Sequence, residues 1–278
     1  MNNIEILYED NDVIVCHKRA GVPVQSANIS VSDLENTVKA YLARKGHEEK
    51  STGLNENEEK PSVYKKKEER ALWAAGNGRK NSELYVIHRL DQPVEGVVVF
   101  AKNKKAAAAL SKQVQAGGGM NKTYLAVVYG RFDEDKKEGR LRDYITKDKV
   151  TKCARIVSPG ESKGAEKSKD IKEAVLDYKV LSEKTVSSEG REEEISLVEI
   201  HLQTGRYHQI RAQFRNTGHP LLGDRRYGTD ESNGLSAELG LKFVALCAKS
   251  LSFKHPASGK DVNFDVTPSE AVFNLENG

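Results

Sequence analysis

Short apolar runs that follow one another with only a turn between them constrain this fold more than any other feature. Residues 4–8 and 13–16 are separated only by the turn-forming acids and asparagine at 10–12. Further runs lie at 97–101, 122–129, 174–181, 195–202, 243–253 and 261–266. Because strands far outnumber helices and often succeed each other directly, the pattern predicts an α+β domain around a largely antiparallel or mixed sheet.

Local signals place a few helices between these strands. Asp33 can cap a helix whose apolar residues recur every four positions, and that helix is expected to end near Gly46. Asn103 can cap an alanine-rich helix that the glycines at 117–119 stop. A third helix is predicted over about 208–217, and a capping box at 267–270 predicts a last short one.

Two polar segments interrupt the pattern. Residues 47–81 are dense in Glu, Lys, Asn, Ser and Gly, and they predict a long mobile insertion. Residues 158–172 predict a second extended loop. A chain of 278 residues can bury a good core as one large domain or two small ones, and we interpret 1–278 as one domain carrying these two insertions.

Charge is segregated along the chain. The formal net charge is only +3, but no Asp or Glu occurs between Gly96 and Arg131, where six Lys and Arg occur. A second stretch, 204–226, holds five arginines and the single acid Asp224. Such segregation fits a basic face that meets phosphate, and ordinary solvated lysine is the alternative that charge alone leaves open.

Cysteine usage and apolar run length indicate the compartment. Cys16, Cys153 and Cys247 form no C-x-x-C pair and read as free thiols of a reducing compartment. The N-terminus has no signal-peptide pattern, and no apolar run is long enough to span a membrane. We therefore expect a cytoplasmic protein, and a monomer.

Three clusters carry residue types suited to chemistry. Asp91 follows His88, Arg89 and Leu90 in a polar turn just before a buried strand, where a catalytic carboxylate would be rigidly held. Arg211 lies at the start of the third predicted helix, in an arginine-rich stretch suited to carboxylate or phosphate. Tyr124 lies in a predicted strand. Taken one at a time, a turn-forming Asp, a solvent-facing Arg and a core Tyr remain alternative interpretations.

Read together, the clusters form an ordered series of motifs. H-R-L-D stands at 88–91, followed by a glycine and an apolar strand ending in F-A-K at 96–102, and K-x-Y stands at 122–124. T-G-R-x-H-Q-I-R stands at 204–211 and G-H-P-L-L-G-D-x-x-Y-G at 218–228. This series, with the opening segments 7–10 and 18–21, resembles the RluA-type pseudouridine synthases over most of the chain outside the two polar segments.

The resemblance implies a pseudouridine synthase fold and the isomerisation of specific uridines in ribosomal or transfer RNA. It implies that Asp91 is the catalytic carboxylate, acting on a flipped-out nucleotide, and that Arg211 keeps the pKa of Asp91 low. It also implies that Tyr124 stacks on the base and helps to move the proton from carbon 5. The remaining implied substrate contacts are His88, Arg89 and Arg206 for phosphate, and Ile210 and Leu246 as apolar walls.

The implied reaction needs no cofactor, because an isomerisation changes no redox state. The histidines at 201, 208 and 219 lack the spacing of a metal site, so no metal is expected. The resemblance begins almost at Met1, so we expect the catalytic domain without the extra N-terminal RNA-binding domain that many members carry. Target choice is then expected to rest on the catalytic domain and on basic residues of the 47–81 segment.

Two departures from the family pattern leave other functions open. Val94 and Glu95 stand where the family usually has Thr-Ser, and Cys247 stands where it often has His. Glu95 is the obvious second carboxylate of a rival Asp-dependent hydrolase of small nucleosides or glycosides. A second rival is an RNA-binding protein that has lost turnover. RNA binding that weakens steeply with salt would separate RNA from a small nucleoside as the ligand.

Overall fold

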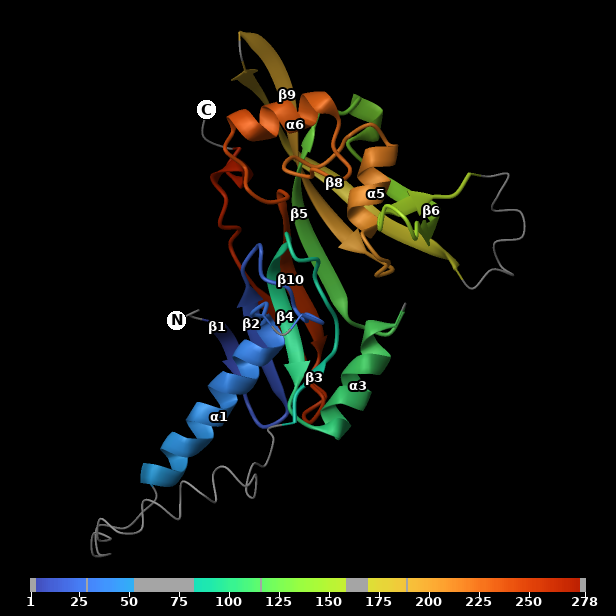
Figure 1. The fold of residues 1–278 in the computed structure, drawn as a ribbon. Coiled ribbons are helices and arrows are strands. Elements are labelled where there is room, and N and C mark those ends of the chain that lie inside the picture. The colour runs from blue at the N-terminus through green and yellow to red at the C-terminus, as the bar shows by residue number, and fades with distance from the viewer. Residues whose placement is uncertain are drawn as a thin grey trace, which may run out of the picture.

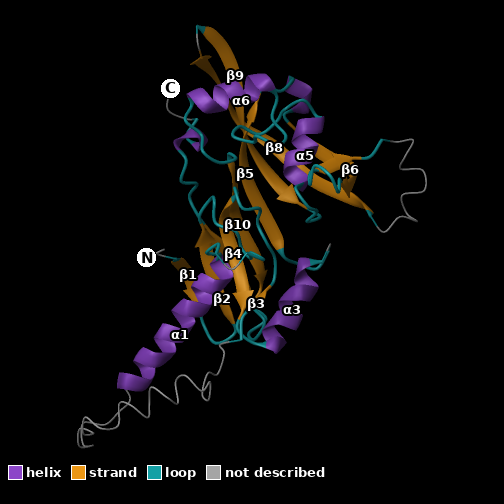
Figure 2. Cartoon of the chain, in the orientation of Figure 1, coloured by secondary structure: helices purple, strands orange, loops and turns teal. Residues whose placement is uncertain are grey.

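Strands form the middle of the molecule and helices lie on its outside (Figure 2). The computed structural model describes residues 4–28, 30–52, 83–115, 117–158, 170–188 and 190–275, with the backbone alone for 46–52. The strands are β1 (Glu5–Glu9), β2 (Val13–Lys18), β3 (Tyr85–Val86), β4 (Glu95–Ala101), β5 (Asn121–Tyr129), β6 (Glu138–Lys147), β7 (Ala154–Ile156), β8 (Ile171–Ser188), β9 (Arg191–Leu202), β10 (Leu246–Lys254) and β11 (Asp261–Asp265). The helices are α1 (Leu34–Thr52), α3 (Lys104–Val114), α5 (Gln209–Asn216) and α6 (Asp230–Glu238), with 3-10 turns at Glu134–Lys136 and Ala271–Phe273.

The strands described join into one mixed sheet. Its order is β1-β2-β4-β10-β5-β9-β8-β6-β7, with β11 paired to β10 and β3 paired to β4. The pair β4–β10 is parallel, and every other described pair is antiparallel. The prediction of an α+β domain with a largely antiparallel or mixed sheet is therefore confirmed.

The central strands bury both of their faces. Along β4 and β5, Val98 and Ala126 point to the face that α1 and α5 cover, while Val99 and Leu125 point to the face that α3 and α6 cover. Figure 1 shows α1 and α3 beside one half of the sheet and α5 and α6 beside the other. Strands buried on both faces read as continuous apolar runs, which is why 97–101 was recognisable in the sequence.

The predicted starts of the first two helices are confirmed by their caps. Asp33 Oδ1 accepts the Asn36 backbone N–H (2.8 Å), and Asn103 Oδ1 accepts that of Ala106 (2.9 Å). The predicted end of the first helix near Gly46 is wrong, because α1 continues to Thr52. A single interior glycine costs a helix only about 1 kcal/mol, and the Glu and Lys residues after it are good helix formers.

The capping box predicted at 267–270 is also wrong. The structure has a 3-10 turn at Ala271–Phe273 with no side-chain cap. In such a box the Thr267 side chain would accept the Glu270 N–H, but here the neighbouring Ser269 is held from elsewhere, with its backbone N–H donating to the Glu95 carboxylate (2.7 Å). A long-range contact thus prevails over the local cap.

The two predicted insertions lie mostly outside the described residues. Residues 47–52 of the first belong to α1, and 53–82 are not described. Of the second, 159–169 are not described, and β8 begins at Ile171. Within the described ranges, no helix is long and apolar enough to cross a membrane.

Candidate active site

A cleft of about 520 Å³ opens where β4, β5, β10 and α5 begin. Its walls come from the turn before β4, the first residues of β5 and β10, the β9–α5 connection and the end of α3. All eight residues that the sequence predicted for the site line it: His88, Arg89, Asp91, Tyr124, Arg206, Ile210, Arg211 and Leu246. The fold thus brings together side chains that lie up to 158 positions apart (246 − 88), while their individual roles stay predictions.

The turn that carries Asp91 is fixed from behind. The Lys18 ammonium, fully buried at the end of β2, donates to the carbonyls of Val22 (2.7 Å) and Gln92 (3.1 Å). The Gly21 N–H also donates to the Gln92 carbonyl (2.8 Å). Both contacts bind the backbone carbonyl of Gln92, the residue directly after Asp91, so the backbone that carries the Asp91 carboxylate has little freedom to move.

One glycine then lets β4 pass close to β10. Gly96 has φ 133°, a value that favours glycine, and a Cβ there would lie 2.4 Å from the Ala248 carbonyl oxygen. The close approach brings Leu246, the first residue of β10, beside the cleft. Glycine at this position is therefore required by geometry on two counts.

An arginine held between two aspartates forms the charged centre of the cleft. Arg211 Nη1 lies 3.2 Å from Asp91 Oδ2. Its Nε and Nη2 donate to Asp224 Oδ2 and Oδ1, each at 2.7 Å. Arg211 and Asp224 are buried, whereas 26% of the Asp91 side chain is exposed. The bidentate pair with Asp224 fixes the guanidinium, and the third nitrogen is left to face Asp91.

Arg211 contacts Asp91 and lowers its pKa, as the resemblance implied, but the expectation that the pKa of Asp91 is therefore low is contradicted. Burial raises the pKa of Asp91 above its ordinary value, and the charges of Arg211 and Lys18 oppose this effect only in part. Because Arg211 is already paired with Asp224, its charge is shared, and the Asp224 charge itself raises the pKa of Asp91 further. A raised carboxyl pKa in a cleft is typical of functional sites.

Tyr124 and two apolar side chains form the lining around this carboxylate. Tyr124 is buried on β5, and burial together with the nearby negative charge of Asp91 raises the pKa of its hydroxyl. The phenol is therefore neutral in the folded protein at ordinary pH. Ile210 and Leu246 are buried as well, so the cleft presents an apolar slot beside a charged end.

The basic side chains around the cleft differ in exposure, in hydrogen bonding and in pKa. Arg89 is exposed, and Arg206 is held by a bond from its Nε to the Glu173 carbonyl (2.7 Å). Burial lowers the pKa of Lys122 to about 8, and among the described residues its ammonium has no hydrogen-bond or ion-pair partner. His88 is buried with its pKa well below the ordinary value, and its Nε2 accepts the Val99 N–H (3.3 Å). His88 can therefore offer a neutral Nδ1–H but no charge.

Glu95, the departure from the family pattern, points away from the cleft. Its carboxylate accepts the backbone N–H of Ser269 (2.7 Å) and the hydroxyl of the same residue. His17 Nε2 lies 3.7 Å from Oε2. Burial alone would raise the pKa of Glu95, but the contacts with His17 and Ser269 lower it. The residue ties the C-terminal segment to β2 and β4.

Replacing Glu95 with glutamine is expected to destabilise the protein only where Glu95 is ionised. A pKa lowered by folding contributes stability above the unfolded value of 4.5, and that contribution is lost as pH falls through the folded value. We expect a loss of about 1.5–3 kcal/mol at pH 7 that disappears at acid pH. Denaturant unfolding across pH measures it. Glu134→Gln, at an exposed carboxylate, is the control, and an equal loss in that variant would contradict the assignment.

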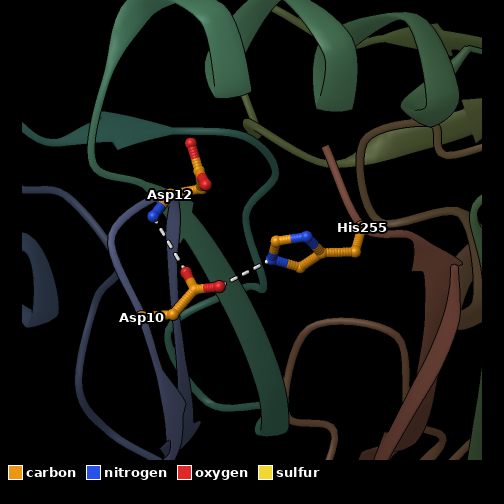
Figure 3. Close-up of side chains that lie close together, drawn as sticks. All are labelled: Asp10, Asp12 and His255. Atoms are coloured by element: carbon orange, nitrogen blue, oxygen red, sulfur yellow. Dashed lines mark hydrogen bonds and ion pairs between the residues drawn. The ribbon is translucent and has the colours of Figure 1, made fainter. Parts of the chain in front are cut away.

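A second charged cluster, Asp10, Asp12 and His255, offers three ligand atoms within 4.8 Å of one another (Figure 3). His255 Nδ1 accepts the backbone N–H groups of Ala257 (3.4 Å) and Ser258 (3.3 Å), so Nε2 carries the proton and faces Asp10 Oδ2 at 2.8 Å. A protonated Nε2 cannot bind a cation. The cluster therefore ties the β1–β2 turn to the segment after β10 and is not a prepared metal site.

Several cleft residues were missed in the sequence as parts of the site. Lys122, Tyr207 and His208 line the cleft, while Lys18, Asp224 and Tyr227 lie behind its lining and bind Gln92, Arg211 and His208, respectively. For Asp224 a signal existed, because it is the single acid in an arginine-rich stretch and such an acid is a natural partner for a buried guanidinium. The others stand inside the motifs at 18–21, 122–124, 204–211 and 218–228, but their residue types alone do not distinguish a role in the site from a structural one.

Comparison with known proteins agrees with this geometry. The family model for RNA pseudouridylate synthase matches residues 12–216. The uncharacterized RNA pseudouridine synthase YhcT of Bacillus subtilis is 30% identical over 226 residues, 81% of this chain and 58% of that protein. Ribosomal large subunit pseudouridine synthase D of Zymomonas mobilis is 30% identical over 266 residues, 94% of this chain and 68% of that protein. tRNA pseudouridine synthase C of Vibrio vulnificus is 33% identical over 183 residues, 64% and 70% of the two chains.

Solved structures agree on the fold. Human RNA pseudouridylate synthase domain containing 4 superposes with a TM-score of 0.62 at 21% identity, covering 97% of this chain and 90% of its own. Human RNA pseudouridylate synthase domain containing 1 gives 0.59 at 18% identity, covering 96% and 84%. The fold and the cleft thus define a pseudouridine synthase domain. The chain belongs to the RNA pseudouridylate synthases, a family of isomerases.

Proposed function

We propose that this chain converts uridine to pseudouridine within RNA at the cleft around Asp91. The observation that carries the proposal is the arrangement of Asp91, Arg211 and Tyr124 in one cleft beside the buried apolar side chains of Ile210 and Leu246. In this reaction the bond between uracil nitrogen 1 and ribose breaks, the base turns, carbon 5 bonds to the ribose, and the proton on carbon 5 is exchanged for one on nitrogen. No atom or electron is gained or lost, so no cofactor is needed.

Each group then has a defined task. Breaking the glycosidic bond develops positive charge on the sugar, which the ionised Asp91 stabilises or traps. Arg211 opposes the effect of burial on the pKa of Asp91, which favours the ionised carboxylate, and it orients that carboxylate. Tyr124, neutral in the folded protein, stacks on the base and relays the proton from carbon 5 as a hydroxyl. Ile210 and Leu246 enclose the ring.

The substrate is proposed to be a flipped-out nucleotide of ribosomal or transfer RNA. A paired uridine cannot reach such a cleft, so it must leave its helix. Arg89, Arg206 and the unpaired Lys122 stand around the cleft where phosphates of the same strand would lie. The named activities of the Zymomonas mobilis and Vibrio vulnificus relatives, on the ribosomal large subunit and on tRNA, favour these two RNA classes. We propose a monomer that acts in the cytoplasm.

The rival hydrolase receives no support. Retaining and inverting glycosidases need two carboxylates that flank the bond. Among the described residues that line the cleft, Asp91 is the only carboxylate. Glu95, the other candidate, is bound to Ser269 outside it.

Tritium release from RNA labelled at carbon 5 of uracil tests the proposal directly. We expect release by the wild type on ribosomal or transfer RNA, and a rate at least about 10³-fold lower for Asp91→Ala. Glu95→Gln, four residues further on, is the matched control and should release tritium like the wild type. Absence of release from the wild type on both RNA classes would favour the binding protein without turnover, and equal release by Asp91→Ala would remove Asp91 from the mechanism.

A further inference from the structure

His208 adopts an unusual backbone conformation beside the cleft. It has φ 50° and ψ 29°, and it shares the left-handed region with Lys152 alone among the described residues other than glycine. This conformation is unfavourable for a residue with a Cβ, so the surroundings must hold it in place. The His208 ring lies buried between Tyr207, stacked at 3.7 Å between centroids, and Tyr227, edge-on at 5.6 Å.

The contact with Tyr227 bears on which ring nitrogen of His208 carries the proton. The Tyr227 hydroxyl accepts the backbone N–H of Ala154 (2.5 Å), and it lies 2.9 Å from His208 Nδ1. With one lone pair taken by the Ala154 N–H, the hydroxyl can donate its own hydrogen to Nδ1, which then acts as an acceptor. In this arrangement the proton of a neutral imidazole is on Nε2, the nitrogen that faces Asp91.

The surroundings also keep the ring uncharged. Burial lowers the pKa of His208 to about 3, and the positive charges of Arg211, Arg226 and Lys147 act in the same direction. Asp224 and Asp91 are the acids that oppose them. A neutral imidazole with a single donor on Nε2 is the result.

That donor faces Asp91. Nε2 lies 3.6 Å from Asp91 Oδ2, the same oxygen that Arg211 Nη1 contacts at 3.2 Å. The separation is longer than a hydrogen bond, but at this distance the N–H dipole still favours negative charge on Oδ2 in the free protein. About a quarter (26%) of the Asp91 side chain is exposed, and hydrogen bonds between catalytic groups often tighten only when substrate binds.

We propose that His208 is a positioning residue that presents a neutral Nε2–H to Asp91, with Tyr227 selecting this tautomer. The effect on catalysis rests on the proposed function, whereas the tautomer and the effect on Asp91 do not. A neutral donor favours the ionised carboxylate and fixes the orientation of Oδ2 without adding a second cation to the Arg211 side of the cleft.

Nitrogen-15 NMR of histidine-labelled protein tests the tautomer without RNA. His208→Gln, which lacks the signal, identifies the His208 resonance. We expect a neutral Nε2–H ring from pH 5 to 8 in the wild type, and a mixture of tautomers in Tyr227→Phe. A protonated ring at pH 6 or the Nδ1–H tautomer in the wild type would overturn the proposal.

Two amide variants of equal chemistry test the effect on Asp91. Glutamine places its amide nitrogen near the position of Nε2, whereas asparagine places it near Nδ1 and also tolerates the left-handed backbone. We expect carbon-13 NMR to show Asp91 titrating about one pH unit higher in His208→Asn than in the wild type, with His208→Gln close to the wild type. Identical titration of Asp91 in all three proteins would exclude the positioning role.

The rate of tritium release against pH extends the test to turnover. In His208→Asn, the fall of the rate on the acid side is expected to occur at a higher pH, shifted by the same amount as the Asp91 titration. In His208→Gln it is expected to occur at the wild-type pH. If the wild type released no tritium, the proposed function would fail while both NMR measurements still decided the role of His208. If the acid side of the pH–rate profile stayed unchanged while Asp91 titrated at higher pH, His208 would affect the Asp91 carboxylate in the free protein but would have no positioning role in the reaction.

Discussion

Asp224→Asn is expected to lower the free energy of unfolding by about 3–5 kcal/mol, the cost of leaving one charge of a buried ion pair without its partner. Asp224 accepts two bonds of 2.7 Å from Arg211, and its side chain is fully buried. Asparagine would keep an acceptor for the backbone N–H groups of Arg226 and Tyr227, but its amide would oppose the guanidinium. Turnover should fall as well, because Arg211 would no longer be held against Asp91.

Denaturant unfolding at pH 7 measures this loss, and the chain provides a matched control. Arg140 and Asp177 form the same kind of fork, with Nε to Oδ1 at 2.6 Å and Nη2 to Oδ2 at 3.1 Å, between two strands on the surface. Asp177→Asn should cost about 1 kcal/mol or less, because water screens an exposed pair. Similar losses in the two variants would mean that burial adds nothing to the Arg211–Asp224 pair.

The parts of the fold that were predictable from sequence are those fixed by local signals. A strand buried on both faces must be apolar throughout, so β4 was visible as 97–101. An Asp or Asn before a periodic apolar stretch caps a helix, so Asp33 and Asn103 marked the starts of α1 and α3. These signals act within a few residues and need no knowledge of the rest of the chain.

The missed elements are stabilised by partners elsewhere in the chain. β6 is mostly exposed, with Ile145 its one buried residue, and it is held by its pairing with β8 and by ion pairs such as Arg142 with Glu173. α6 begins with a capping box between Thr229 and Ser232, but Leu235 is its only large buried side chain. Without an apolar period, neither segment could be recognised as regular structure.

The candidate site shows the same division. The ordered motifs identified eight residues that line one cleft, but they did not predict the pKa values or the contacts of the side chains there. The pKa of Asp91 is raised because burial outweighs a guanidinium that Asp224 already neutralises, and this balance exists only in three dimensions. Likewise, Glu95 stands four positions from Asp91 but faces Ser269, because Asp91 lies in the turn before β4 whereas Glu95 is the first residue of the strand itself.

Tyr124→Phe is expected to reduce the rate of tritium release by about 10²–10⁴-fold while RNA binding changes little. The phenyl ring keeps the stacking surface and fills the same buried volume, so protein stability and binding of the base should change little. What is lost is the hydroxyl, the group we assign to the proton of carbon 5. Burial and the Asp91 charge raise the pKa of this hydroxyl, so it can act only as a neutral relay and not as a phenolate.

Single-turnover rates and RNA binding, measured on the same preparations, separate these two contributions. Tyr129→Phe is the control, because Tyr129 lies at the other end of β5 with its hydroxyl on Glu193 (2.6 Å), and it should leave the rate unchanged. Tyr124→Ala should weaken binding of the flipped base as well as slow the reaction, since it removes the ring. A Tyr124→Phe enzyme with full activity would mean that the proton leaves by another route, and Tyr124 would then serve the base as a stacking surface alone.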